Sequence, residues 1–270
     1  MQAMRIVADS AGAALAPLPL PVLHRAGGWI DPLPYRQQAA GELPMPQQNL
    51  AQSSGLTTIR LSDGEHAALY QSDAATLDFV IAGTLDIAGT RLAPGDVVLG
   101  GAASCGARSA GDCHLVRLGV AADWPGSDAV LQDSGTIVPR PRAEPNLRRM
   151  DMRPDGRTWS ASFANLFPAP TGQWSPLIPL RGFRFLCFPD GAFIDWHPEV
   201  VNNLAIFLSG DMEIEIGGGG GPKIDHFLAG DVLLAADRTG EGHIDRMHGN
   251  IHLALIVLDD EHLWPIEPQA

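Results

Sequence analysis

Two histidines in the last third of the chain have a spacing that could hold a metal ion. The stretch "AFIDWHPEVVNNLAIFLSGDMEIEIGGGGGPKIDHFLAGDVLLAADRTGEGH" contains His197 and ends at His243. Alternate residues of a strand share a face, so Asp195 and His197 are expected to point the same way. Together they could chelate a divalent ion, with His243 as a third ligand and Asn203 as a weak fourth through its amide oxygen. This mixed N/O set suits Zn, Mn, Fe or Ni better than calcium.

Each of these side chains also has an ordinary structural role open to it. Asp195 could accept hydrogen bonds from the backbone, and His197 precedes Pro198, which forces an extended backbone. His243 could stabilise the turn "TGEG" before it. Three protein ligands with an open position would form a catalytic centre, where water or substrate binds the metal. Without a metal, the two histidines would be pocket residues or remnants of a lost site.

Four further residues are candidates for contact with a substrate, and none is assigned a catalytic role. The planar forks of Arg184 and Arg246 could bind a carboxylate, although solvated arginine is the commoner case. Trp196 is a candidate aromatic wall and Met247 a candidate lining residue, and each could equally be ordinary core. The glycine run at 217–221 lacks the Lys-Ser/Thr of a phosphate loop, and no nucleophile elbow or dinucleotide fingerprint is present.

The elements that position these residues belong to an internal repeat, whose blocks keep the same order in both copies. "LDFVIAGTLDI" at 77–87 resembles "LAIFLSGDMEI" at 204–214, and "LAPGDVVLGG" at 92–101 resembles "FLAGDVLLAA" at 227–236. "HLVRLGV" at 114–120 resembles "HLALIVL" at 252–258, and "MRIVADSAG" at 4–12 pairs weakly with "LRRMDMRPDG" at 147–156. The repeat divides the chain into an N-terminal unit, a linker rich in Pro, Ser, Gly and Asp, and a C-terminal unit. The predicted boundaries are 1–124, 125–146 and 147–270.

The composition favours short strands over helices and argues against nucleic acid as a partner. Thirty glycines and 22 prolines punctuate alternating or short apolar runs, which predicts an all-β chain with few short helices. The net charge is -13 and Lys223 is the only lysine, so a basic surface for nucleic acid is not expected. No apolar segment approaches the roughly 20 residues that span a bilayer. Three cysteines without a CxxC motif and the lack of a signal peptide indicate a cytoplasmic protein.

The second half resembles the cupin superfamily of small jelly-roll β-barrels, which carry two short motifs. The first motif, G-x5-H-x-H-x(3,4)-E-x6-G, maps onto "GAFIDWHPEVVNNLAIFLSG" at 191–210. The second, G-x5-P-x-G-x2-H-x3-N, maps onto "GDVLLAADRTGEGHIDRM" at 230–247, with a longer first gap. The first half matches only in its glycine and strand framework. The whole chain therefore resembles a bicupin of a little-characterised bacterial type, with two tandem barrels.

The resemblance implies a metal site in the C-terminal barrel alone. In the superfamily two His and a Glu of the first motif and one His of the second hold a divalent metal. Carried over residue by residue, these positions fall on Asp195, His197, Asn203 and His243. The matching positions of the first half include no histidine, so no metal is expected there. One divalent transition metal (Zn, Mn, Fe or Ni) is the cofactor expectation.

Two functions of different classes stay open. The first is a metal-dependent enzyme acting on a small organic acid, sugar derivative or aromatic in the C-terminal barrel. The second is a non-enzymatic bicupin that binds or senses a small molecule in a metal-free pocket. The prediction common to both is a small-molecule-binding bicupin, whose status as an enzyme is undecided. The resemblance also implies a homodimer.

Overall fold

The chain consists almost entirely of strands. A computed structural model describes residues 6–8, 50, 52–68, 76–87, 90–100, 106–120, 144–217 and 221–259. Within these ranges the regular structure is β-strand, apart from one short 3-10 turn, η2 (Ala164–Leu166). The predicted all-β class is therefore confirmed. No helix in the described ranges is long and apolar enough to cross a membrane.

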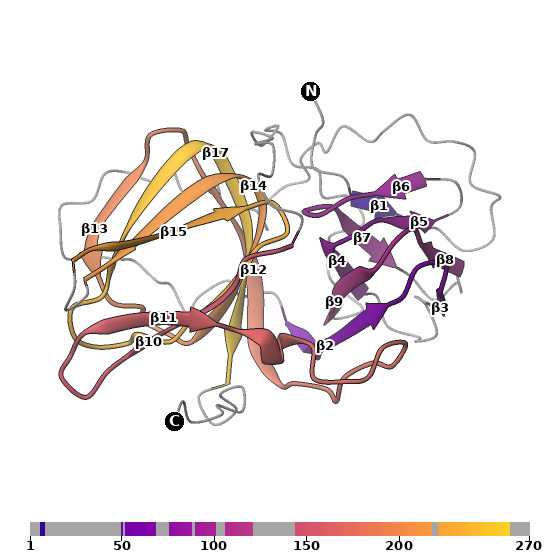
Figure 1. Cartoon of the computed structure of the whole chain (residues 1–270), viewed down its shortest axis with the longest axis horizontal. Coiled ribbons are helices and arrows are strands. Elements are labelled where there is room, and N and C mark those ends of the chain that lie inside the picture. The colour runs from indigo at the N-terminus through magenta and orange to yellow at the C-terminus, as the bar shows by residue number, and fades with distance from the viewer. Residues whose placement is uncertain are drawn as a thin grey trace.

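The first half of the chain forms two sheets, coloured purple in Figure 1. A five-stranded sheet has the order β1-β7-β4-β9-β2, and a four-stranded sheet has the order β3-β8-β5-β6. Tight turns join many of these strands, as the glycine spacing predicts. The strands are β1 (Ile6–Ala8), β2 (Ser53–Leu61), β3 (His66–Ala68), β4 (Thr76–Ala82), β5 (Leu85–Ile87), β6 (Thr90–Leu92), β7 (Val97–Gly100), β8 (Gly106–Ser109) and β9 (Cys113–Val120).

The second half forms one larger sheet that curls around an apolar interior (Figure 1). Its order is β11-β10-β16-β14-β17-β12, with β13 added on β17 and β15 added on β14. Ile216 pairs with Lys223, so β14 and β15 form a hairpin whose strands flank the glycine run at 217–221. The strands are β10 (Leu147–Met152), β11 (Thr158–Ser162), β12 (Leu180–Phe188), β13 (Phe193–His197), β14 (Asn203–Ile216), β15 (Lys223–Leu228), β16 (Val232–Ala235) and β17 (His243–Leu258).

The two halves repeat the same strand order. The path β1-β7-β4-β9-β2 in the first half corresponds to β10-β16-β14-β17-β12 in the second. The first pair of each path is parallel, since β1 pairs with β7 and β10 with β16 in that sense. The internal repeat seen in the sequence is therefore a repeat of topology. The weak match between 4–12 and 147–156 corresponds to β1 and β10.

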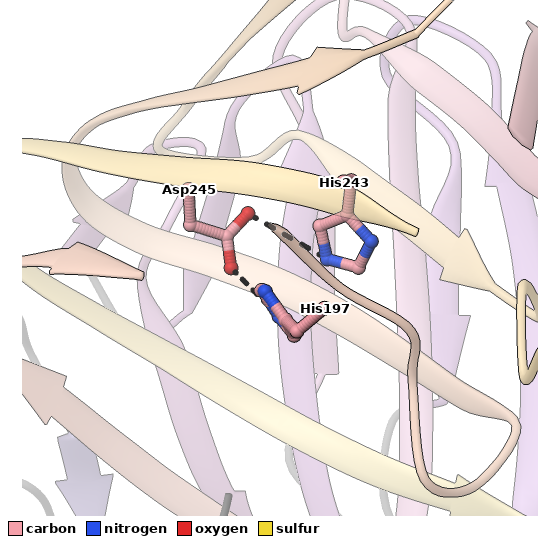
Figure 2. A group of neighbouring side chains, drawn as sticks. All are labelled: His197, His243 and Asp245. Carbon is pink, nitrogen blue, oxygen red and sulfur yellow. Dashed lines mark ion pairs between the residues drawn. The ribbon is translucent and has the colours of Figure 1, made fainter. Parts of the chain in front are cut away.

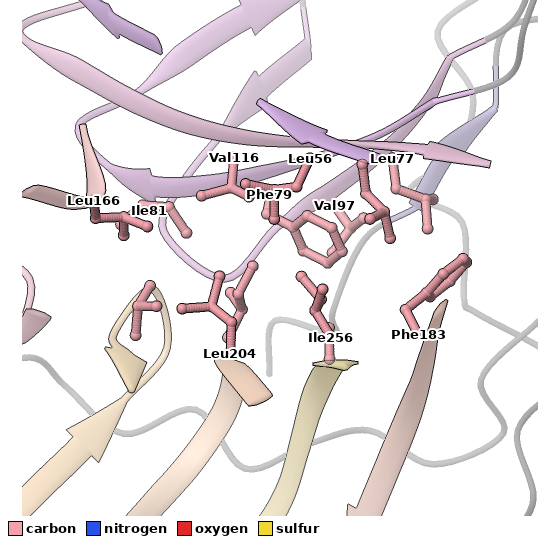
Figure 3. Close-up of a cluster of buried hydrophobic side chains, with 14 of the residues drawn as sticks. Leu56, Leu77, Phe79, Ile81, Val97, Val116, Leu166, Phe183, Leu204 and Ile256 are labelled. Atoms are coloured by element: carbon pink, nitrogen blue, oxygen red, sulfur yellow. The ribbon is translucent and has the colours of Figure 1, made fainter. Parts of the chain in front are cut away.

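The largest of three apolar clusters in the described residues lies between the halves (Figure 3). Strands β2, β4, β7 and β9 present one face to β12, β14, β16 and β17. The Phe79 and Phe185 rings meet across this boundary with centroids 6.3 Å apart. A second cluster fills the first half and a third fills the second half. The cluster between the halves, called here the shared core, includes Leu56, Leu77, Phe79, Ile81, Val97, Val116, Leu166, Phe183, Phe185, Leu204, Ile206, Leu208 and Ile256.

A segment of the second half, residues 166–178, runs along the edge of the first half and is called here the crossing segment. Ile178 and Leu56 exchange backbone hydrogen bonds of 2.8 and 2.9 Å. Ser175 donates its amide to the Thr58 carbonyl at 2.8 Å, and its hydroxyl accepts from the Thr58 amide at 2.9 Å. Strand β2 is the end of its sheet, so the crossing segment covers an edge that would otherwise be unpaired.

The crossing segment also covers a buried ion pair of the first half. Asp78 is fully buried and binds Arg117 through two hydrogen bonds of 2.7 and 3.1 Å. The guanidinium of Arg117 lies over the Trp174 ring, 4.1 Å from its centroid. Burial raises the pKa of the Asp78 carboxyl, and the adjacent Arg117 opposes this increase. The second half thus supplies the aromatic wall of an ion pair in the first.

The predicted domain boundaries at residues 124 and 147 remain predictions. Residues 125–143 of the predicted linker lie outside the described residues. The predicted closure of each half into a separate barrel also stays a prediction. The shared core and the crossing segment show instead how closely the two halves are joined.

Candidate metal centre

Two neighbouring strands bring three possible ligands together at one end of the second half. His197 ends β13 and pairs with His243, which begins β17, while Asp245 follows two residues later on the same face of β17. One donor atom from each residue lies within 4.8 Å of the others. The Asp245 carboxylate reaches both rings, with Oδ2 3.6 Å from His197 Nε2 and Oδ1 3.7 Å from His243 Nε2 (Figure 2).

A bulge in β13 decides which residues face this group. Ile194 pairs with Asp245 but His197 pairs with His243, so β13 has one more residue than β17 between these two pairs. The extra residue breaks the alternation that placed Asp195 beside His197 in the sequence-based prediction. The Asp195 carboxylate is exposed and accepts a 2.9 Å hydrogen bond from the Trp196 amide. The structure therefore places Asp195 outside the group, and Asp245 takes the position expected for its carboxylate.

Both histidines present Nε2 to the centre because their Nδ1 atoms are engaged elsewhere. His197 Nδ1 donates to the backbone carbonyl of Asp195 at 2.8 Å, since a carbonyl can only accept. His243 Nδ1 lies 2.8 Å from Asp237 Oδ2, and Asp237 is fully buried. Ligating histidines commonly hold their second nitrogen in this way. The two rings are thus oriented as a pair of nitrogen ligands.

Glu199 flanks the group as a further carboxylate, and Asn203 holds it. Glu199 Oε1 lies 3.9 Å from His243 Nε2, and its side chain is 20% exposed. Asn203, which begins β14, is buried, hydrogen bonds to Glu199 and donates to the Val201 carbonyl at 3.3 Å. The prediction of Asn203 as a ligand stays untested. Its side chain contacts Glu199 and is not one of the three grouped donors.

Buried acidic groups and imidazoles shift one another's pKa values at this site. Burial opposes the charge of His243, but Asp245, Asp237 and Glu199 outweigh it and raise the pKa of this histidine to about 9. Burial, with Asp237 and Asp245 adding to it, raises the pKa of Glu199 to about 7. Burial also raises the pKa of Asp245 and lowers that of His197. Several acidic groups thus share one buried pocket with two imidazoles.

Two buried carboxylate oxygens of this group have no hydrogen-bond partner among the described residues, and the one that belongs to a grouped donor, Asp245, fits a metal ion. Asp245 Oδ1 and Asp237 Oδ1 are both of this kind. A buried acceptor without a partner is destabilising, so native structures rarely keep one without a reason. A metal about 2.1 Å from each donor would separate neighbouring donors by about 3.0–3.4 Å. The grouped donors lie within 4.8 Å of one another, so Asp245 and the two rings would have to move inward to hold a metal, which would also give Asp245 Oδ1 a partner.

The four residues predicted for substrate contact lie apart from one another. Arg246 lies on the outer face, with Nη2 2.6 Å from Glu215 Oε2 and its guanidinium carbon 5.7 Å from the Phe193 ring centroid. Trp196 is 42% exposed, and Met247 is buried in the apolar interior of the second half. Arg184, on β12, pairs with Leu255 and is half-buried. Substrate contact by these residues stays a prediction.

Sequence reasoning missed Asp245, Asp237 and Glu199. Asp245 had a usable signal, because His243 and Asp245 alternate on one predicted strand. Glu199 could swing toward a metal, but its position after Pro198 favours a solvated loop, so the sequence does not single it out. Asp237 lies in the turn-forming stretch "AADRTGEG" and had no periodicity to mark it.

Comparison with known proteins finds similarity at the level of the fold. No family model and no curated protein matches the chain. Among solved structures, a cupin 2 conserved barrel domain protein from Leptotrichia buccalis is 13% identical with a TM-score of 0.38, covering 77% of this chain and 86% of that one. Oxalate decarboxylase from Bacillus subtilis, described with Mn(II) centres, is 13% identical with a TM-score of 0.28, covering 77% and 70%. The cupin-type fold predicted from the motifs agrees with these similarities, which concern the fold alone.

Proposed function

We propose that the chain is a small-molecule-binding protein whose second half holds one divalent transition metal through His197, His243 and Asp245. One observation carries the proposal: two oriented imidazoles and a buried carboxylate converge, and Asp245 Oδ1 has no hydrogen-bond partner in the part of the chain that the structure describes. Two histidines and one carboxylate with open positions suit Fe(II), and Mn(II) accepts the same ligands. The Mn(II) centres described for oxalate decarboxylase accord with this choice of metal.

The arrangement favours an enzyme over a purely structural metal site. Three protein ligands leave coordination positions open for water or substrate, whereas structural zinc sites are closed by four. The metal would polarise a carbonyl or lower the pKa of bound water. His197 is 12% exposed and Glu199 20%, so a small molecule would approach from their side. His243 and Asp245 lie deeper, at 1% and 6%.

Glu199 is placed to handle a proton or a polar group of the substrate. Its carboxylate borders the solvent side of the centre and is held by Asn203. A carboxyl whose pKa is raised to about 7 can accept or donate a proton near neutral pH. The substrate class proposed is a small organic molecule with a carbonyl or hydroxyl group that can reach the metal.

Metal content tests this proposal directly. We expect near-stoichiometric metal by elemental mass spectrometry in protein purified without a histidine tag or chelator. The substitutions His197→Ala, His243→Ala and Asp245→Ala should each remove it. The matched control is Asp195→Ala, which should retain it because that carboxylate faces solvent. A folded wild-type protein without metal would overturn the proposal and favour ligand binding in a metal-free pocket.

A further inference from the structure

Asp237 occupies a special position between the two segments that carry the proposed ligands. It lies just beyond β16, is fully buried, and is not itself one of the three grouped donors. Its Oδ2 accepts from His243 Nδ1 at 2.8 Å and from the Thr158 hydroxyl at 3.3 Å. Its backbone carbonyl accepts from the Glu199 amide at 3.3 Å. One residue therefore contacts both the β17 ligand and the segment that follows β13.

The contact with His243 fixes the chemistry of the ring. A carboxylate oxygen can only accept, so the neutral ring that can bind a metal carries its hydrogen on Nδ1 and has its lone pair on Nε2. A carboxylate partner also makes the ring a stronger ligand than a neutral partner does. His197 differs in this respect, because its Nδ1 is held by the neutral backbone carbonyl of Asp195. The two nitrogen ligands are therefore held by different means.

The turn that follows Asp237 closes directly on the other ligand segment. Gly242 has φ +75, and a Cβ at this position would lie 2.1 Å from the His197 carbonyl oxygen. A side chain is thus excluded by both backbone conformation and contact. This close approach and the Glu199–Asp237 hydrogen bond fix the backbone on either side of Pro198 against the Asp237 turn.

We propose that Asp237 is a positioning residue of the metal centre. It holds His243 in the tautomer that ligates through Nε2, and it sets the segment from His197 to Glu199 against that ring. The inference rests on the proposed metal site at His197, His243 and Asp245. It predicts that metal affinity depends on a carboxylate that does not touch the metal.

The test compares Asp237→Ala and Asp237→Asn with the control Thr158→Val. Thr158 is buried and contacts the same oxygen, so its isosteric replacement removes a neighbour of Asp237 without touching His243. Affinity for Mn²⁺ or Zn²⁺ is measured by competition with a chromophoric chelator. Asp237→Ala should weaken binding by about 10–100-fold, the usual effect of losing such a partner. The metal affinity of Asp237→Asn should fall between those of the wild type and of Asp237→Ala, because the amide oxygen of Asn still accepts from Nδ1 but carries no charge.

A spectroscopic readout separates positioning from a general loss of stability. In the Zn²⁺-loaded wild-type protein, long-range ¹H–¹⁵N spectra should show protonated Nδ1 and metal-bound Nε2 for both rings. Asp237→Ala should alter the His243 signals and leave those of His197 in place. If Asp237→Ala does not fold, Asp237→Asn carries the test.

The outcomes distinguish this inference from the proposed function. Wild-type affinity in both Asp237 variants would overturn the positioning role while the metal site stands. An equal loss of affinity in Thr158→Val would also overturn it, because the effect would then come from packing. A wild-type protein that binds neither Mn²⁺ nor Zn²⁺ would overturn the proposed function itself.

Discussion

Removing one ring from the shared core should loosen both halves of the chain together. Phe185 on β12 is 3% exposed, and its ring centroid lies 6.3 Å from that of Phe79 in the first half and 6.2 Å from that of Phe183. The substitution Phe185→Ala deletes both ring contacts and leaves a cavity between the halves. The perturbation is made in the second half, and its effect is predicted in the first.

The size of the effect follows from burial. A buried Phe→Ala change in a core costs about 3–5 kcal/mol, which is a large part of the 5–15 kcal/mol that stabilises a typical domain. At about 1.4 kcal/mol per tenfold change, amides that exchange through global opening should lose about 10²–10³-fold or more of their protection. The exposed Phe193→Ala change is the control and should alter stability by about 0.5 kcal/mol or less.

Hydrogen exchange read by mass spectrometry locates the effect. We expect faster exchange in peptides from β4 and β9 of the first half as well as from β12 and β17 of the second. The reason is that these four strands line the same shared core. Faster exchange confined to β12 and β17 would refute the reasoning, because it would show that the halves open independently.

Three further predictions concern metal, pH and the buried ion pair. Metal at about 100 times its Kd should stabilise the protein by about 2.7 kcal/mol and raise Tm by about 5–10 °C in a thermal scan, with no rise in His243→Ala. Because the pKa of His243 is raised to about 9, protons compete with metal below that pH. Affinity measured by chelator competition should therefore rise between pH 6 and 9, by up to about tenfold per unit, and a flat profile would contradict this. Asp78→Ala should cost about 3–5 kcal/mol in urea unfolding by leaving Arg117 without its buried carboxylate, whereas Asp86→Ala, from an exposed pair, should cost about 1 kcal/mol or less.

The fold could largely be predicted from the sequence, because the same order of apolar runs and glycines occurs twice along the chain. The apolar runs at 77–87 and 204–214 became β4 with β5 and β14, and they pair with the same relative neighbours in each half. The shared core could not be predicted from the sequence. Ile206 and Leu208 on β14 lie between the halves. Strand alternation separates two faces, and both faces of β14 are apolar, so alternation could not say which one the first half covers.

The candidate site was predicted in part, and a single inserted residue explains why the structure places Asp195 outside it. His197 and His243 were identified, and the structure brings their rings to a centroid distance of 4.3 Å. Asp195 was chosen by strict alternation, which the bulge in β13 breaks. Asp245 was overlooked because the cupin motif places no ligand there. Asp237 acts through a hydrogen bond across a turn, a relation that periodicity does not encode.

Through the shared core, the first half acts as a binding partner of the second half within the same chain. If the second half were a separate protein, a second copy would have to cover its apolar sheet face. The stability gained from such an association would fall on dilution. Here the two halves belong to one chain, so the covering surface is always present and does not depend on the protein concentration. The first half therefore serves the second by covering its apolar face, a role that requires no ligand residue. Substitutions there should be judged by their effect on the stability of the sheet that carries the proposed ligands.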